Sequence, residues 1–110
     1  LKAHGTASAL NDTAEINGMK LVFEKLPPFF SLKPYIGHTL GSCGSSELLL
    51  LMESVDHGFI PPSPNFTHMD EEFGCAPLQK KMPCKSGLFM LNYFGFGGNN
   101  TSLIIEKAAQ

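Results

Sequence analysis

Apolar residues in the first part of the chain recur with the spacing of a helix. They occupy Met19, Val22, Phe23 and Leu26, which are three- and four-residue steps along one helical face. Asn11 or Asp12 can cap the start of this helix, and the spacing from Asp12 to Glu15 is that of a capping box. The pattern predicts a helix from Asp12 to about Lys25, which Pro27–Pro28 ends.

A second apolar stretch predicts a helix over residues 42–57, with Gly58 placed to end it. The middle of this stretch is apolar around most of its circumference, which is typical of a helix buried on several sides. We therefore expect it to be an inner layer of the fold. Between the two helices, residues 29–32 form an apolar run of strand length, and residues 33–44 form a turn rich in Gly and Ser.

The remaining apolar runs have the length and flanking turns of strands. Strands are predicted at residues 1–4, 77–79, 87–93 and 102–106. A glycine turn at 95–100 joins the last two as a hairpin, and the Pro-rich segment 61–84 runs along the surface. The alternation of strands and helices indicates an α/β layered fold within one domain covering residues 1–110. The first residues are typical of a strand already under way, so we expect the chain to be a piece of a longer protein.

Composition narrows the classes of function. The net charge of -2 is unsuited to tracking a phosphate backbone, so we expect no nucleic-acid partner. No apolar run approaches the roughly 18 residues of a membrane-spanning helix. The cysteines, Cys43, Cys75 and Cys84, are odd in number and irregular in spacing. That spacing favours reduced thiols in a cytoplasmic protein over disulfides, and it predicts no metal site.

Three groups of residues next to glycine turns carry candidate chemistry. They are the segment His4–Ser8, the set Lys33, His38 and Glu47, and the glycine turn at 94–100. Each alone has an ordinary explanation, since histidines at strand ends are usually structural and most glycine turns are only turns. In layered α/β folds, however, strand ends gather at one crevice. Two imidazole donors near a lysine can polarise a carbonyl and stabilise an enolate, and glycine N–H groups can form an oxyanion hole.

The same segments, in order, resemble motifs of the β-ketoacyl synthases, which are condensing enzymes with a thiolase-like fold. HGTAS at 4–8 resembles HGTxT, KPYIGHTLGSCGSSE at 33–47 resembles the lysine and GHTLGAAG motif with its downstream glutamate, and NYFGFGGNN at 92–100 resembles NSFGFGGTN. The resemblance spans nearly the whole chain. It implies part of the carboxyl-terminal half of an αβαβα layered sandwich.

The resemblance also implies roles for individual residues. His4 and His38 resemble the two histidines that bind the malonyl thioester carbonyl and promote decarboxylation. Lys33 resembles the active-site lysine and Glu47 its buried acidic partner. Phe96 resembles the gatekeeping phenylalanine, and its backbone N–H the second oxyanion-hole donor.

Substrate-binding positions follow from the resemblance in the same way. Thr6 and Ser8 resemble the hydroxyl residues that hydrogen-bond the phosphopantetheine arm. The acyl pocket would be lined by Phe94, Gly95 and Gly97.

Two positions depart from the usual family residues in ways that bear on the site. Cys43 lies in the GSCG segment, but the family's nucleophilic cysteine belongs to another motif, and Cys43 is expected to be inert. Tyr93 stands where a small serine is common, which reshapes the acyl pocket.

The function implied is that of a β-ketoacyl-acyl-carrier-protein synthase, an acyltransferase that condenses a malonyl thioester with an acyl thioester. Fatty-acid, polyketide and aryl-polyene synthesis all use this chemistry. The expected partners are an acyl carrier protein, an amino-terminal half with the cysteine nucleophile, and a second subunit in a homo- or heterodimer. No cofactor is expected beyond the phosphopantetheine that arrives on the carrier.

Without a nucleophile of its own, the chain alone is predicted not to condense. Two alternatives remain: a chain-length-factor-like partner that does not condense, and a structural or interaction module. A purely structural module has no need of His4, Lys33 and His38 together.

Overall fold

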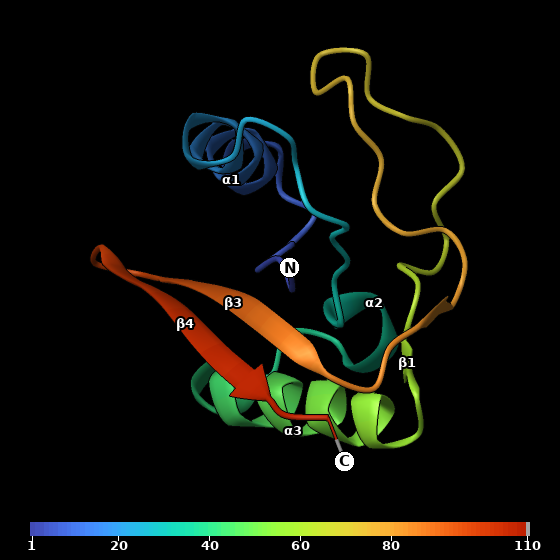
Figure 1. Cartoon of the computed structure of the whole chain (residues 1–110). Helices are drawn as coiled ribbons and strands as arrows, with labels where there is room; N and C mark the ends of the chain where they lie inside the picture. The colour runs from blue at the N-terminus through green and yellow to red at the C-terminus, as the bar shows by residue number, and fades with distance from the viewer. Residues whose placement is uncertain (110) are drawn as a thin grey trace.

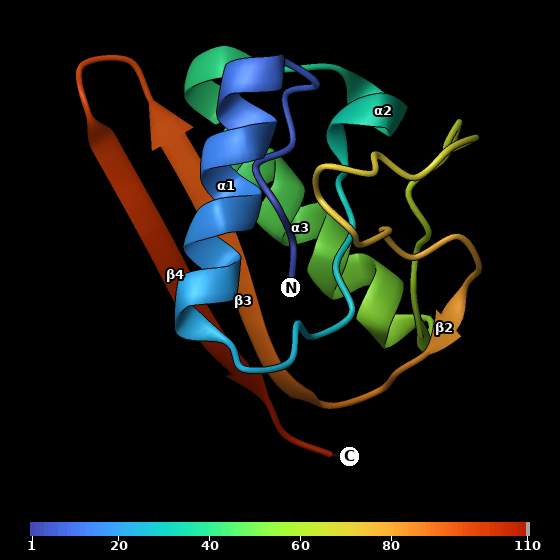
Figure 2. The same ribbon diagram turned by 90° about the horizontal axis from the view of Figure 1, so that it is seen from above.

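Two helices enclose a small twisted sheet in the structure, a computed structural model that describes residues 1–109. Helix α1 (Ala9–Val22) and helix α3 (Cys43–Asp56) lie on opposite sides of strand β3 (Gly87–Gly95), as Figures 1 and 2 show. A long loop leads from β1 (Phe59–Ile60) to β2 (Met82–Pro83), and these two short strands pair antiparallel beside α3. The layering agrees with the predicted α/β arrangement.

The amino-terminal residues form the centre of the sheet. Lys2 bridges in parallel to Phe30 on one side and to Leu91 of β3 on the other. Its amide donates to the Met90 carbonyl at 2.8 Å, and its carbonyl accepts from the Asn92 amide at 3.0 Å. Strand β4 (Asn99–Lys107) pairs antiparallel along the far edge of β3. The side chain of Lys2, which points inward from this segment, is therefore enclosed on every side.

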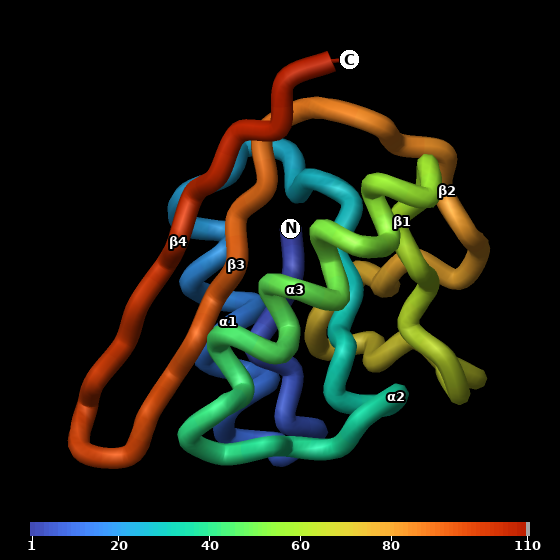
Figure 3. The backbone as a smooth tube through the Cα atoms, turned by 90° about the horizontal axis from the view of Figure 1, so that it is seen from below, coloured from blue at the N-terminus to red at the C-terminus, as the bar shows by residue number. Residues whose placement is uncertain are grey.

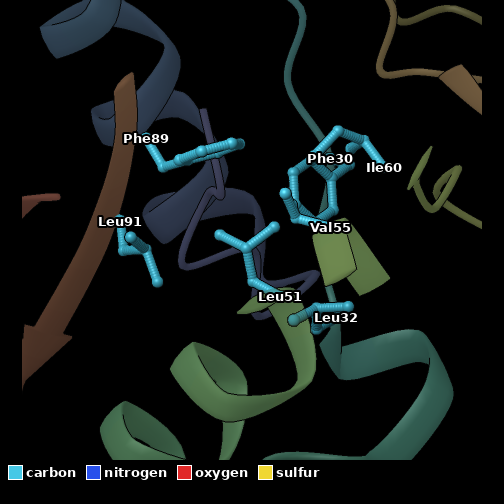
Figure 4. Close-up of a cluster of buried hydrophobic side chains, with 7 residues drawn as sticks. All are labelled: Phe30, Leu32, Leu51, Val55, Ile60, Phe89 and Leu91. Atoms are coloured by element: carbon cyan, nitrogen blue, oxygen red, sulfur yellow. The ribbon is translucent and has the colours of Figure 1, made fainter. Parts of the chain in front are cut away.

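The apolar core lies between the sheet and α3. Leu51 and Val55 of α3 face β3 and the neighbouring extended segments (Figure 4). The cluster is completed by Phe30, Leu32, Ile60, Phe89 and Leu91. Along β3, Phe89 and Leu91 alternate with Met90 and Asn92, because successive strand side chains point to opposite faces. Met90 and Asn92 face α1 instead.

Helix α1 begins earlier than the sequence pattern predicts. Its N-cap is Ser8, whose hydroxyl accepts from the Asn11 amide, so neither Asn11 nor Asp12 is the cap. The predicted capping box is wrong because Glu15 turns into the interior and binds backbone amides of another segment. The helix ends at Val22, which is exposed, rather than continuing to the prolines.

The predicted second helix agrees with α3 to within one residue at each end. Gly58 follows it in a left-handed conformation, φ 86°, and its amide donates to the Val55 carbonyl. Only one face of α3 is buried in this chain, whereas Leu49 and Leu50 are exposed. The preceding turn also differs from the prediction, because residues 33–36 form helix α2 (Lys33–Ile36) and Leu40–Ser42 form a 3₁₀ turn, η1.

The carboxyl-terminal hairpin is confirmed, and both strands are longer than predicted. Its turn projects from the edge of the molecule (Figure 3). The predicted strands at 1–4 and 29–32 reduce to single bridges at Lys2 and Phe30. At 77–79, Leu78 makes backbone hydrogen bonds to Phe29 and Ser63 without forming a strand. Among residues 1–109, no helix has the length and apolar character needed to cross a bilayer.

The burial pattern of α3 makes a stability prediction. Leu51 is 0% exposed and Leu49 is 69% exposed on the same helix. Leu51→Ala should lower the free energy of unfolding by about 2–5 kcal/mol through lost burial and a cavity. Leu49→Ala should change it by less than about 0.5 kcal/mol, as expected at the surface. Denaturant unfolding of both variants measures the difference, and equal losses would contradict the assignment of the buried face.

Candidate active site

His4 lies at the end of the central, amino-terminal segment of the sheet, and hydrogen bonds to its backbone hold it in place. Its amide donates to Glu15 Oε1 at 2.8 Å, and the Gly5 amide donates to Glu15 Oε2 at 3.0 Å. Gly5 has φ +55°, and a Cβ there would lie 2.5 Å from Ser31 Oγ. Only glycine allows this close passage, so the sharp turn after His4 depends on that residue.

Lys33 approaches His4 from the first turn of α2. Its Nζ donates to the His4 carbonyl at 2.6 Å and to Glu47 Oε1 at 2.9 Å, and it lies 3.2 Å from His4 Nδ1. An ammonium group can only donate, so His4 Nδ1 must be the acceptor. The proton of the neutral imidazole is therefore on Nε2.

His38 reaches the same place from the turn after α2. Its Nδ1 accepts from the Leu40 amide at 3.1 Å, so its ring is likewise protonated on Nε2. The two imidazole rings meet edge to face with centroids 5.5 Å apart. Gly37, with φ +74°, supplies the left-handed step that turns the chain into His38. Two neutral imidazoles thus offer Nε2–H donors at one site.

His4 is held in its neutral form by its surroundings. Burial of the ring, which leaves the residue 3% exposed, is the main cause, and the ammonium groups of Lys33 and Lys2 add to it. Together they lower the pKa of His4 from 6.5 to about 4. The imidazole therefore remains a neutral donor at physiological pH.

Glu47 is the buried acid of the site, and it binds two lysines. Its carboxylate is fully buried on α3 and pairs with Lys33 through Oε1 and with Lys2 through Oε2 at 2.6 Å. The sequence interpretation paired Glu47 with Lys33 alone and missed Lys2. The missed signal is the strand alternation, which places Lys2 and His4 on the same side of the central segment.

Two residues of β3 support this arrangement. Tyr93 places its ring 4.0 Å from Lys2 Nζ, and its hydroxyl donates to the Gly44 carbonyl at 3.0 Å. Burial raises the pKa of Tyr93 to about 12, so the hydroxyl stays a donor. On the opposite face, Asn92 donates to Glu15 Oε1 at 3.4 Å and accepts from Ser102 Oγ at 2.8 Å.

Of the other predicted residues, Phe94 lies beside His4, whereas Gly95, Phe96 and Gly97 lie at the β3–β4 turn. The ring of Phe94 is 5.6 Å from that of His4. Phe96 is 99% exposed in the β3–β4 turn, together with Gly97. Gly95 ends β3 at that turn.

Thr6 and Ser8 bind each other through their hydroxyls at 3.3 Å, and Ser8 also caps α1. Their predicted contacts with phosphopantetheine stay predictions.

The described part of the chain, residues 1–109, contains no group of three or more His, Cys, Asp or Glu side chains arranged to hold a metal ion. Cys43, at the start of α3, is half-buried, and Cys75 and Cys84 are half-buried elsewhere. All three are free thiols.

Comparison with known proteins identifies the family. Residues 1–67 match the family described as "Beta-ketoacyl synthase, C-terminal domain". The chain belongs to the β-ketoacyl synthase family. A crystal structure of a β-ketoacyl synthase from Burkholderia phymatum STM815 superimposes with a TM-score of 0.85 at 37% identity, over 98% of this chain and 27% of that one. This likeness confirms the thiolase-like α/β fold class predicted from the sequence.

Sequence relatives include 3-oxoacyl-[acyl-carrier-protein] synthases and a polyketide synthase. The 3-oxoacyl-[acyl-carrier-protein] synthase 1 of Buchnera aphidicola subsp. Baizongia pistaciae is 36% identical over 97% of this chain, and that of Escherichia coli K12 is 34% identical over the same share. A highly reducing polyketide synthase of Alternaria alternata is 29% identical over 100% of the chain. The chain spans 27% of the length of either 3-oxoacyl synthase and 5% of the polyketide synthase.

The protonation state of His4 is directly testable. Its ring should titrate with a midpoint of about pH 4 by NMR in the folded protein, against 6.5 for the ordinary residue. As the pH falls below 6.5, His4 takes up a proton in the unfolded chain before it does so in the folded protein. The contribution of His4 to the free energy of unfolding is therefore complete above pH 6.5 and is lost as pH falls toward 4.

Lys33→Met should raise the His4 midpoint, because it removes the nearest positive charge. Lys80→Met, at an exposed lysine of the long loop, serves as the control and should leave the midpoint unchanged. A wild-type midpoint near 6.5 would contradict the buried neutral state.

Proposed function

We propose that this chain supplies the decarboxylation and enolate-stabilising residues of a β-ketoacyl-acyl-carrier-protein synthase. In that reaction a malonyl thioester on a carrier protein loses CO₂, and the resulting carbanion is acylated by a thioester held on the enzyme. The single observation that carries the proposal is the pairing of His4 and His38. Both rings have Nδ1 occupied by a donor, so both present Nε2–H.

The chemistry needs two such donors at one oxygen. When the bond between the malonyl carboxylate and its α-carbon breaks, the electron pair moves to the thioester carbonyl oxygen and forms an enolate. Hydrogen bonds from both Nε2–H groups stabilise that negative charge as it develops. The enolate carbon then attacks the acyl thioester, the new carbon–carbon bond forms, and the thiolate leaves. Neutral imidazoles suit this role because they donate without transferring their protons.

Lys33 and Glu47 act behind the histidines. Lys33 holds His4 by its carbonyl and by Nδ1, and Glu47 holds Lys33. This arrangement fixes the ring orientation and the tautomer before substrate binds, which lowers the cost of reorganisation during the reaction. Phe94, beside His4, and the Phe96 turn would shape the acyl pocket, and Thr6 and Ser8 would bind the phosphopantetheine arm.

The partners of the site belong to the same proposal. The names of the bacterial relatives specify an acyl carrier protein, which supports such a substrate here. The acyl group would be held by a cysteine outside these 110 residues, and the chain alone would not condense. Phosphopantetheine would arrive on the carrier as the only prosthetic group, in a cytoplasmic enzyme.

Exposed apolar side chains on α1 and on the β3–β4 hairpin support association with another part of the synthase or a second copy. They include Leu10, Leu21 and Val22 of α1 and Leu88, Leu103 and Ile104 of the hairpin. Exposed apolar side chains that gather on one surface commonly mark an interface. Size-exclusion chromatography of the chain should give a dimer or larger species, and a monomer across the concentration range would contradict this part of the proposal.

The site can be tested through decarboxylation alone. In the protein that carries this chain, His4→Ala and His38→Ala should each lower the rate of malonyl-carrier decarboxylation by about 10²–10³, the usual loss for one oxyanion donor. Release of CO₂ from labelled malonyl-carrier measures the rate. His57→Ala, at the exposed end of α3, is the matched control and should retain the wild-type rate.

The same assays separate the alternatives. A chain-length-factor-like subunit would not take up a labelled acyl group as a thioester, whereas a condensing synthase would. A structural module would show no decarboxylation above background, and the two histidine variants would match the wild type. That result would overturn the proposed function.

A further inference from the structure

Lys2 is the most deeply enclosed charged side chain that the family motifs do not include. Its Nζ donates to Glu47 Oε2 at 2.6 Å and to the Asn92 carbonyl at 3.1 Å, and it lies 4.0 Å from the centre of the Tyr93 ring. These three neighbours are a carboxylate, a carbonyl and an aromatic face, all of which accept and none of which donates. The three hydrogens of an ammonium match them, whereas a neutral amine would leave its lone pair without a donor.

We propose that Lys2 is a positioning residue that occupies one oxygen of Glu47, so that the buried cluster keeps a net positive charge and directs Lys33 toward His4. The inference rests on the proposed function and adds to it a residue outside the conventional site. Lys2 does not touch the reacting atoms, and it acts through Glu47.

Charge counting explains the effect. One carboxylate and one ammonium would form a neutral pair. The negative charge of Glu47 would then cancel most of the positive potential that Lys33 creates at His4. Here one carboxylate, Glu47, is bound by two ammonium groups, one on each oxygen. The charges of Lys2, Lys33 and Glu47 sum to +1, so a positive potential remains beside the His4 ring. The same potential favours a substrate that is an anion, such as a malonyl carboxylate or an enolate.

A second buried carboxylate, Glu15, lies near His4 and brings the formal sum of all four charges to zero. It is bound by two backbone amides and by Asn92 on the α1 side, and the charges that shift the pKa of His4 are those of Lys33, Lys2, Glu47 and His38. His38 packs edge to face against the His4 ring, and its charge when protonated adds to the lowering of the His4 pKa. The groups that face His4 are Lys2, Lys33, Glu47, Glu15 and His38.

Protonation of His4 would disable the site through geometry. An imidazolium carries a hydrogen on Nδ1, where Lys33 already directs its own hydrogen at 3.2 Å. Two donors would then face each other, and Lys33 would have to withdraw from His4. Lys2 therefore extends the pH range in which His4 and Lys33 stay aligned, down to more acidic conditions.

The test compares charge at nearly constant volume. Lys2→Met removes the charge with a small change of side-chain volume and leaves Glu47 paired with Lys33 at net zero charge. We expect it to raise the NMR midpoint of His4 by about one pH unit, a typical effect of one nearby charge. The acid limb of the decarboxylation profile should move up by the same amount in the protein that carries this chain. Lys2→Arg keeps the charge and should leave both readings near wild type.

A charge-restoring variant provides the decisive control. Lys2→Met with Glu47→Gln leaves Lys33 as the only charge of the three-residue cluster, so the sum of that cluster returns to +1 and the His4 midpoint should return to or below the wild-type value. If Lys2→Met does not fold, this double variant still decides the matter, because a raised midpoint in it would overturn the proposal. An unchanged midpoint in folded Lys2→Met would also overturn it.

The NMR midpoint does not depend on turnover, so it separates the two levels of inference. A shifted midpoint in a protein without decarboxylase activity would support the role of Lys2 and contradict the proposed function. A shifted acid limb without a shifted midpoint would contradict the role of Lys2.

Discussion

The burial of one carboxylate, Glu47, is the constraint on which the site depends. It lies on α3 with no exposure to solvent and binds one ammonium from the central segment of the sheet and one from α2. Moving an ion into the interior costs several kcal/mol, which only well-placed partners offset. The three elements therefore cannot slide or rotate relative to one another without breaking an ion pair. That constraint sets the distance from Lys33 to His4, and with it the tautomer of the imidazole.

The sequence predicted the elements whose signals are local. The period of apolar residues located α3 to within one residue at each end, and the glycine turn located the β3–β4 hairpin. The cap of α1 was predicted wrongly because Glu15 has two possible partners. Locally it fits a capping box, but in the fold its carboxylate is needed for the amides of His4 and Gly5. A tertiary contact decided between them, and no spacing along the chain records it.

The candidate site shows the same division. The motifs indicated His4, Lys33, His38 and Glu47, and these residues do meet. Lys2 was missed because a lysine near a strand end is usually solvated, and only the pairing of β3 beside it encloses the side chain. The sequence also did not indicate that Phe96 is exposed. Its exposure depends on how far the hairpin extends beyond the helices, which is set by the number of β4 residues that pair with β3.

The position of residues 1–3 in the middle of the sheet has a consequence for folding. Lys2 and the Asn92 carbonyl are 90 residues apart in sequence, and Lys2 and Glu47 are 45 apart. Such distant contacts form late, because closing long loops costs entropy before the contacts repay it. The side of the amino-terminal segment that faces β3 therefore stays unpaired until the hairpin has formed, although its other side can already pair with Phe30. The ion pairs of Glu47 need no residue beyond 47, but Lys2 becomes enclosed only when β3 packs beside it, so the enclosure of the site is completed late in folding.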